Sequence, residues 1–216
     1  MPQQVPQDPM RAQQYRTQRA ELPEDLWQPL YDRVNYPAAG TSLLGFFSTP
    51  RGQSATLLST VSAGVWSTAT KVKTFRDTNI ENSNVVPTKM FKVVGVSIGF
   101  FHANPALATC AVDREVLRGG AYLQFRIVDK DIIFLPLITI PELNPIAGVS
   151  TTATATTIVA TSGGGGQNVP MYKFPIPITI NPYENFTVTL NSDNSPTVVQ
   201  TLDIYMMLHA YMRRPT

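Results

Sequence analysis

The chain has 216 residues, of which 43% are hydrophobic and only 15% are charged, and its net charge is +2. Roughly 25% of the residues in an ordinary soluble domain are charged, so this chain leaves much neutral surface, which tends to meet other protein chains. No run of Lys or Arg is present, which argues against specific nucleic-acid binding. The length fits one β-sandwich or barrel of the larger kind.

The compartment is constrained by what the sequence lacks. The lone Cys110 cannot form an internal disulfide, so nothing requires an oxidising environment. The first residues show no basic segment followed by an apolar one, so we expect no secretory signal. No stretch of about 18 uninterrupted apolar residues occurs, so we expect a chain that is made in a cytoplasm and does not span a membrane.

Residues 1–38 are predicted to form an arm and a short helical lid, followed by a main domain over 39–216. Residues 1–20 are rich in Gln and Pro and cannot bury much surface, so we expect a flexible arm. Within residues 21–37 the apolar side chains follow helical spacing, at Leu22, Leu26, Trp27, Leu30 and Val34. This lid packs either on its own domain or on a neighbouring subunit; both alternatives stay open.

Period-two alternation begins at about residue 41 and predicts strands to the end of the chain. Residues 89–102 form the clearest strand, with Val94, Val96, Ile98 and Phe100 expected on one face. Residues 121–128 repeat the alternation, with Leu123 and Phe125 inward, and the turn Asp129-Lys130-Asp131 predicts a hairpin into Ile132–Ile140. That second strand is apolar on both faces, so we expect both faces to be covered.

One interior helix and three closing strands complete the prediction. The helix would be capped by Asn104 and ended by Gly119-Gly120. The Thr/Ala stretch of residues 149–166 predicts a projecting hairpin with Gly163–Gly166 at its base. The closing strands are expected over Met171–Ile180, Phe186–Leu190 and Val198–Arg213, and the last of them places Leu202 and alternate residues on one face. Together these elements predict an all-β, antiparallel sandwich, a jelly roll of about eight strands.

The search for chemistry yields no catalytic, cofactor or metal site. The imidazoles of His102 and His209 are far apart in the sequence, and each is predicted to be an ordinary packed or surface residue. Asp129 and Asp131 are predicted to lie in a solvated turn, and Asp113 with Glu115 to form surface ion pairs beside Arg114. Three further features carry no site: Cys110 is expected in the core, Gly163–Gly166 lacks the context of a phosphate loop, and Asn185-Phe186-Thr187 matches a glycosylation sequon by chance.

A polar arm, a sandwich pattern and a sparsely charged exterior with long loops stand together in this sequence. The combination resembles the jelly-roll capsid proteins of icosahedral viruses, including small tailless bacteriophages. The likeness is greatest at the end of the chain, through Ile176–Ile180, Asn181–Asn185, Phe186–Leu190 and the strand beginning Val198-Val199-Gln200.

The resemblance implies a structural capsid protein that self-assembles into a viral shell and resides in the virion, not an enzyme. Its partners would be copies of itself and other capsid proteins, and its arm would tie subunits together or lie over an internal membrane. Long outward loops would be available to a host receptor. The alternative is a receptor- or carbohydrate-binding β-sandwich module of a spike or surface protein, for which Trp27 and Trp66 are few and far apart.

Overall fold

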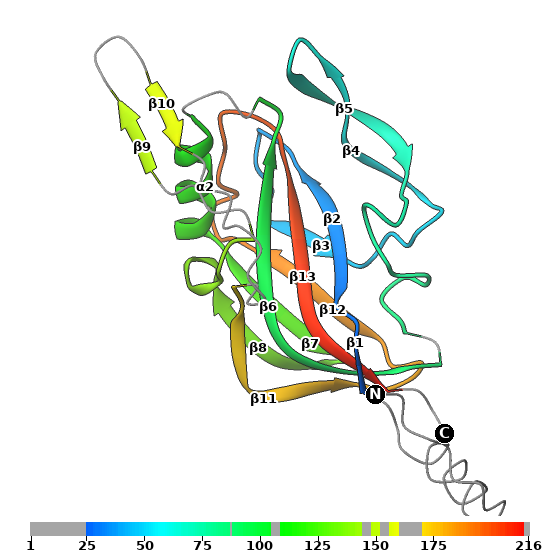
Figure 1. Ribbon diagram of the computed structural model, residues 1–216. Coiled ribbons are helices and arrows are strands. Elements are labelled where there is room, and N and C mark those ends of the chain that lie inside the picture. The colour runs from blue at the N-terminus through cyan, green and yellow to red at the C-terminus, as the bar shows by residue number, and fades with distance from the viewer. Residues whose placement is uncertain are drawn as a thin grey trace, which may run out of the picture.

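Two antiparallel sheets pack face to face around one apolar core (Figure 1). The computed structural model describes residues 25–86, 88–104, 109–143, 148–151, 156–159 and 170–213. The first sheet has the order β2 (Leu30–Tyr36), β13 (Leu202–Arg213), β6 (Met90–His102), β11 (Tyr172–Ile180), and β1 (Asp25–Trp27) pairs with the far end of β13. The second has the order β3 (Leu43–Phe46), β12 (Phe186–Asn191), β7 (Tyr122–Ile127), β8 (Lys130–Pro136).

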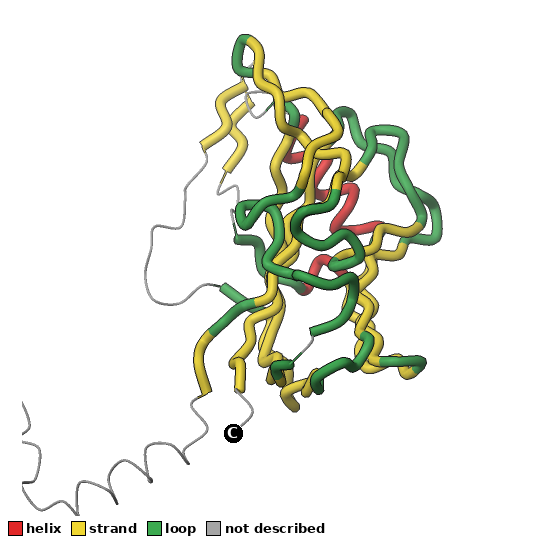
Figure 2. The backbone as a smooth tube through the Cα atoms, turned by 90° about the vertical axis from the view of Figure 1, so that its right-hand side faces the viewer, coloured by secondary structure: helices red, strands yellow, loops and turns green. Residues whose placement is uncertain are grey.

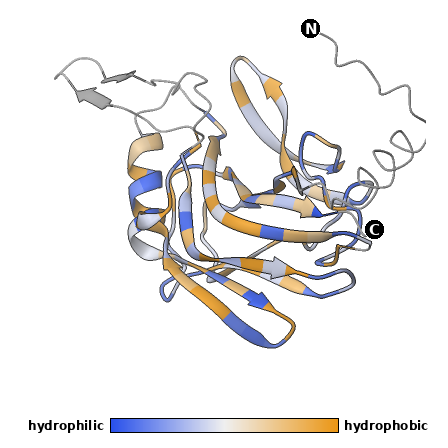
Figure 3. Ribbon diagram, turned by 60° about the horizontal axis from the view of Figure 1, so that its bottom comes forward, coloured by the Kyte–Doolittle hydropathy of each residue, from blue (hydrophilic) through white to orange (hydrophobic). Residues whose placement is uncertain are grey.

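The strand order identifies the topology. Counted along the chain from β2, and leaving out the separate hairpins β4–β5 and β9–β10, the first sheet runs first-eighth-third-sixth and the second runs second-seventh-fourth-fifth. This is the order that two interleaved Greek keys give. The predicted all-β antiparallel sandwich with jelly-roll connections is therefore confirmed. Hydrophobic and hydrophilic residues alternate along its strands (Figure 3), as two layers with one buried face each require.

The long pair β6 and β13 forms the centre of the first sheet. In β13 the residues Leu202, Ile204, Met206, Leu208, Ala210 and Met212 are all buried in the core, as predicted. The faces predicted for β6 are wrong at one end, because the register shifts beside Val94. This β-bulge places Phe91 and Val93 on the same core face as Val96, Ile98 and Phe100.

The helix predicted over 21–37 is wrong for the described residues. Residues 25–27 and 30–36 are strands that both pair with β13, and Gln28 donates its backbone N–H to the Ala210 carbonyl between them. Leu30 and Val34 are four residues apart, which is compatible with one face of a helix and also with one face of a strand. The pairing partner, not the local spacing, decides between the two.

The predicted hairpin of β7 and β8 is confirmed, but its second strand is shorter than expected. β8 ends at Pro136, and a single 3-10 turn, η1 (Leu137–Thr139), follows. Leu123 and Phe125 point into the core, as predicted. The expectation that both faces of residues 132–140 are covered is not met by the described part of this chain, because Ile132, Phe134 and Ile138 are exposed.

The remaining elements are insertions between the sandwich strands. The predicted helix is present as α2 (Thr109–Gly120), shown lying against the strands in Figure 2; its expected first residues from Pro105 lie outside the described range. The predicted Thr/Ala ribbon is present as β9 (Gly148–Thr151) paired with β10 (Thr156–Val159), whereas Gly163–Gly166 lies outside the described residues. A further hairpin, β4 (Ser54–Ser62) with β5 (Val65–Val72), crosses the outer side of the first sheet.

Candidate functional site

The four sheet edges differ in how far they are protected from another strand. The β2 edge is covered by residues 78–79: Thr78 bridges Asp32, and Asn79 exchanges hydrogen bonds with Tyr31. The β11 edge contains Pro175 and Pro177, which cannot donate to a new ladder. The β3 edge is only four residues long. Short strands and prolines are devices that keep edges from pairing.

The β8 edge lacks these protections over most of its length. Its only proline, Pro136, is the last residue of the strand, and Lys130 and Asp131 stand at the start. Ile133 and Leu135 face the core, whereas Phe134 points to the outer side of the sheet, where its ring contacts Tyr122 at 6.2 Å. Among the described residues no strand pairs with the outer side of β8, whose one irregularity is a register shift at Ile132, so backbone groups there can meet a further strand.

Apolar side chains continue along the same region of the surface. Ile132, Phe134 and Ile138 are 41%, 55% and 56% exposed, and Val128 in the preceding turn is also exposed. The charged groups nearby are few: Arg126 pairs with Asp131 at 2.9 Å, and Gln124 donates to the same carboxylate. We call Val128, Ile132, Phe134 and Ile138 the β8 surface.

A second feature lies on the outer face of the first sheet, beneath the β4–β5 hairpin. Arg33 on β2 donates to the Asp203 carboxylate from Nε at 2.8 Å, and its Nη2 lies 2.7 Å from the same oxygen. The same Nη2 donates to the Leu58 carbonyl at 2.7 Å, and Leu58 returns its N–H to Asp203 at 2.9 Å. Since Asp203 is fully buried and Arg33 is 6% exposed, this pair joins the hairpin to the sheet in a dry environment.

The loop after β5 is held by a neighbouring set of charges. Asp77 accepts hydrogen bonds from Lys71 at 2.8 Å and from the backbone N–H of Thr74 at 3.0 Å. Burial acts to raise the pKa of Asp77, but these hydrogen bonds outweigh it and hold the pKa below its ordinary value. Lys73 pairs with Asp32 at 2.6 Å, and both are buried. We call Asp32, Arg33, Lys71, Lys73, Asp77 and Asp203 the ion network.

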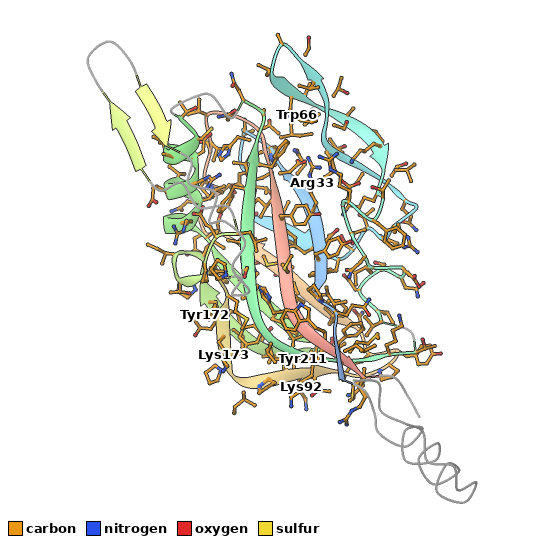
Figure 4. All side chains as sticks on the ribbon, in the orientation of Figure 1. Arg33, Trp66, Lys92, Tyr172, Lys173 and Tyr211 are labelled. Atoms are coloured by element: carbon orange, nitrogen blue, oxygen red, sulfur yellow. The ribbon has the colours of Figure 1, made fainter. Side chains whose placement is uncertain are left out.

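A cavity of about 260 Å³ opens between the hairpin and the sheet beside the ion network. Three of its lining residues are cations, namely Arg33, Lys71 and Arg76, and three are aromatic, namely Trp66, Phe101 and Tyr205. Figure 4 shows Trp66 on the hairpin and Arg33 on the sheet below it. The rings of Trp66 and Phe101 meet edge to face at 5.1 Å. This combination of rings and cations is typical of a ligand site.

Asp113 and Arg114 on α2 are buried, whereas the sequence predicted them at the surface. Both are buried, so the expected surface ion pairing is wrong for them, whereas Glu115 is exposed. Asp113 accepts the backbone N–H groups of Val199 and Gln200 at 2.6 and 3.3 Å. Arg114 instead pairs with Glu142 at 2.7 Å. These groups tie α2 to the segment before β13 and have a structural role.

His102 and His209 lie on different strands, and each is packed, as predicted. Burial and the charge of Arg114 lower the pKa of His102 to about 4. His209 Nε2 lies 2.7 Å from the Ser97 hydroxyl. Ser97 donates its single proton to the Pro170 carbonyl, so it accepts from His209 and is not activated as a nucleophile by it.

Aromatic side chains gather at the opposite end of the same outer face. Trp27 contacts His209 at 5.7 Å and Tyr211 at 5.2 Å. Figure 4 shows Tyr211 near Lys92 at this end, remote from Trp66. The two tryptophans are therefore far apart, as predicted, but each belongs to an aromatic cluster that the sequence did not reveal.

The other residues singled out in the sequence have structural positions. Cys110 is buried, as predicted, and burial raises the pKa of its thiol. Asp129 and Asp131 are both exposed, as predicted, with Asp129 in the β7–β8 turn and Asp131 at the start of β8. Asn185 is exposed, but Phe186 in the same sequon is fully buried. No group of three or more potential metal ligands occurs within the described ranges.

The ion network and the cavity were missed by sequence reasoning. One indication was available: Lys71 and Lys73 are two residues apart at the end of β5, and Asp203 lies on the polar face of β13. The partners in the network lie far apart in the sequence. Arg33 is 170 positions from Asp203 and 44 positions from Asp77. Contacts at such separations depend on the topology, which single-strand patterns do not specify.

Comparison with known proteins adds no family to this description. A scan against models of protein families finds no match, and a search of curated proteins finds no relative. Among the described helices none is long and apolar enough to cross a membrane.

Proposed function

We propose that this chain is a structural subunit that associates with copies of itself, one contact being made through the β8 surface, to form a shell of the kind built by viral capsid proteins. The observation that carries the proposal is an edge strand with no proline before its last residue, bordered by exposed Ile132, Phe134 and Ile138. An open apolar edge is a template for pairing with another chain. The jelly-roll topology supports the proposal as a likeness of architecture.

The simplest contact is a pair of β8 strands from two copies. Two identical edges pair antiparallel about a two-fold axis, so that each Phe134 meets the apolar side chains of the other copy. Lys130 and Asp131 at the start of each strand then lie at the two outer ends of the pair, where their charges stay exposed. In this proposal the chain acts in a virion and has no catalytic role.

The test is to place a charge on the edge. Phe134→Lys introduces the device by which natural edges avoid pairing, while Ile176→Lys changes an even more exposed apolar residue on the proline-containing β11. Light scattering at micromolar concentration and negative-stain microscopy should show multimers for the natural chain and for Ile176→Lys, and smaller species for Phe134→Lys. A natural chain that stays monomeric across salt and pH, or equal effects of both variants, would overturn the proposal.

One observation favours a second function, a ligand-binding surface module. Trp66 is part of a cluster with Phe101 and Tyr205 around a cavity, so the aromatic surface expected of such a module is present. Binding of a small ligand by the single chain, with no multimers formed, would favour this function over shell formation.

A further inference from the structure

We propose that the cavity beneath the β4–β5 hairpin binds a small ring compound that carries one carboxylate, such as a sugar acid or an aromatic acid. The inference concerns the single chain and does not rest on the shell-forming proposal. It starts from the charges and rings that line the cavity and from the way its walls are held.

The charge of the cavity selects a single anion. Its lining cations Arg33, Lys71 and Arg76 face two buried carboxylates: Asp203 pairs with Arg33, and Asp77 pairs with both Arg33 and Lys71. Arg76 has no ion pair within the described part of the chain, so one positive charge is left over. A monoanion balances it, whereas a phosphate monoester with two charges exceeds it.

The guanidinium of Arg76 also selects the shape of the anion. A planar fork of N–H donors binds a carboxylate through two parallel hydrogen bonds. Lys71 commits its ammonium to the two oxygens of Asp77, at 2.8 and 2.9 Å, and each ammonium carries three donors. A third donor therefore remains to support a carboxylate held by Arg76.

The apolar part of the cavity selects a ring. Tyr205 lines the cavity together with Trp66 and Phe101, and its ring is stacked against Tyr31 with the ring centroids 6.2 Å apart. Leu58 and the half-buried Trp66 add apolar surface. A volume of 260 Å³ lies just below the roughly 300–1,000 Å³ of drug-sized ligand pockets, so it fits one ring and its substituents.

The walls are fixed before a ligand arrives. The Tyr205 hydroxyl donates to the Arg76 carbonyl, which holds the backbone that carries the selecting guanidinium. Arg33 and Asp203 hold Leu58 from the other side. Burial raises the pKa of Tyr205 to about 12, so this hydroxyl keeps its proton across the physiological range. Because little ordering remains to be done, the ordering cost of binding is small.

Saturation-transfer NMR on the full chain, in whatever assembly it adopts, tests the inference. The probes are glucuronate, N-acetylneuraminate and benzoate, with glucose as an uncharged comparator and glucose 6-phosphate as a dianionic one. At least one carboxylate should bind saturably and at least tenfold more tightly than both comparators. Binding of the sugar acids alone identifies a carbohydrate ligand, and binding of benzoate alone identifies an aromatic acid.

Two variants separate this site from general attraction of anions. Arg76→Gln removes the cation that selects the anion. Its side chain is exposed, and the hydrogen bond from the Tyr205 hydroxyl to the backbone carbonyl of residue 76 is kept. This variant should weaken binding of the carboxylate ligand at least tenfold. Lys173→Gln removes an exposed cation on β11, far from the cavity (Figure 4), and should change nothing. No saturable binding of any carboxylate, equal binding by Arg76→Gln, or tighter binding of glucose 6-phosphate would each overturn the inference.

Discussion

Removal of the Asp203 carboxylate is the most direct test of how the β4–β5 hairpin is attached. In Asp203→Ala, Arg33 stays buried at 6% exposure, and its remaining carboxylate is Asp77 at the long distance of 3.4 Å. Breaking a buried ion pair by removing one partner typically costs about 3–5 kcal/mol. The Leu58 N–H also loses its acceptor, and an unsatisfied buried donor costs about 1–3 kcal/mol. We expect a loss of at least about 4 kcal/mol in the free energy of unfolding, from the sum of the two lower limits.

Urea unfolding followed by circular dichroism measures this loss, and two matched variants interpret it. Glu81→Ala breaks the exposed pair of Arg51 and Glu81, where Glu81 is 64% exposed, and should cost less than about 1 kcal/mol. Arg33→Met combined with Asp203→Leu replaces the pair by apolar groups of similar size and should recover the part of the loss that comes from the unpaired charge, while Leu58 still lacks its two hydrogen-bond partners. If Asp203→Ala costs no more than Glu81→Ala, the ion network does not hold the hairpin.

Three further outcomes are expected. The pKa of His102 is about 4 in the folded chain and 6.5 in the unfolded chain. Between these two pH values the unfolded state binds more protons than the folded state. The free energy of unfolding should therefore fall by up to about 3 kcal/mol as the pH drops from 6.5 to 4. Urea unfolding at pH 7 and pH 4.5 should show a smaller drop for His102→Gln, and an identical drop would contradict the assignment. Gly95→Ala places a Cβ 2.5 Å from the Tyr172 carbonyl oxygen and should lower the free energy of unfolding by about 1–3 kcal/mol. Gly119→Ala, with open space around the new Cβ, should cost nothing. If calorimetry finds the two variants equally stable, the close packing of β6 and β11 is refuted. Asp113→Ala removes the acceptor for two backbone N–H groups ahead of β13 and should cost about 1–3 kcal/mol by urea unfolding; a neutral result would show that water replaces the carboxylate.

Alternation predicted most of the sandwich because each strand buries one face. β7, β11, β12 and β13 begin or end within a few residues of the predicted positions, and the jelly roll follows from their number and spacing. The core face of β13 was predicted in full because no bulge interrupts that strand.

The failures occur where a nonlocal contact overrides the local pattern. The Val94 bulge reverses the face of β6 without any change in the alternation of its sequence. β2 was predicted as helix because its buried polar residue, Asp32, hides the period of two. Asp32 is buried only because Lys73 and the Phe47 N–H supply hydrogen bonds from elsewhere in the chain. A polar side chain with a distant partner cannot be assigned to a face from its own segment.

The candidate sites follow the same division. The apolar character of the β8 surface was visible in the sequence, because Ile132–Ile140 is apolar on both faces, but the described part of the chain covers only one of them. The cavity could not be predicted from the sequence. Four of its lining residues come from separate segments that only the inserted hairpin brings together, namely Arg33, Trp66, Arg76 and Tyr205.

Burial of charge also changes what the composition implies about the surface. The chain has 17 basic and 15 acidic residues, and seven of those within the described ranges are buried. The seven are Asp32, Arg33, Lys73, Asp77, Asp113, Arg114 and Asp203. Buried pairs contribute little net stability relative to apolar residues, so their value here lies in fixing the positions of the hairpin and the helix. An exterior already poor in charge is thereby depleted further, and an exterior of that kind is the one expected to meet other chains.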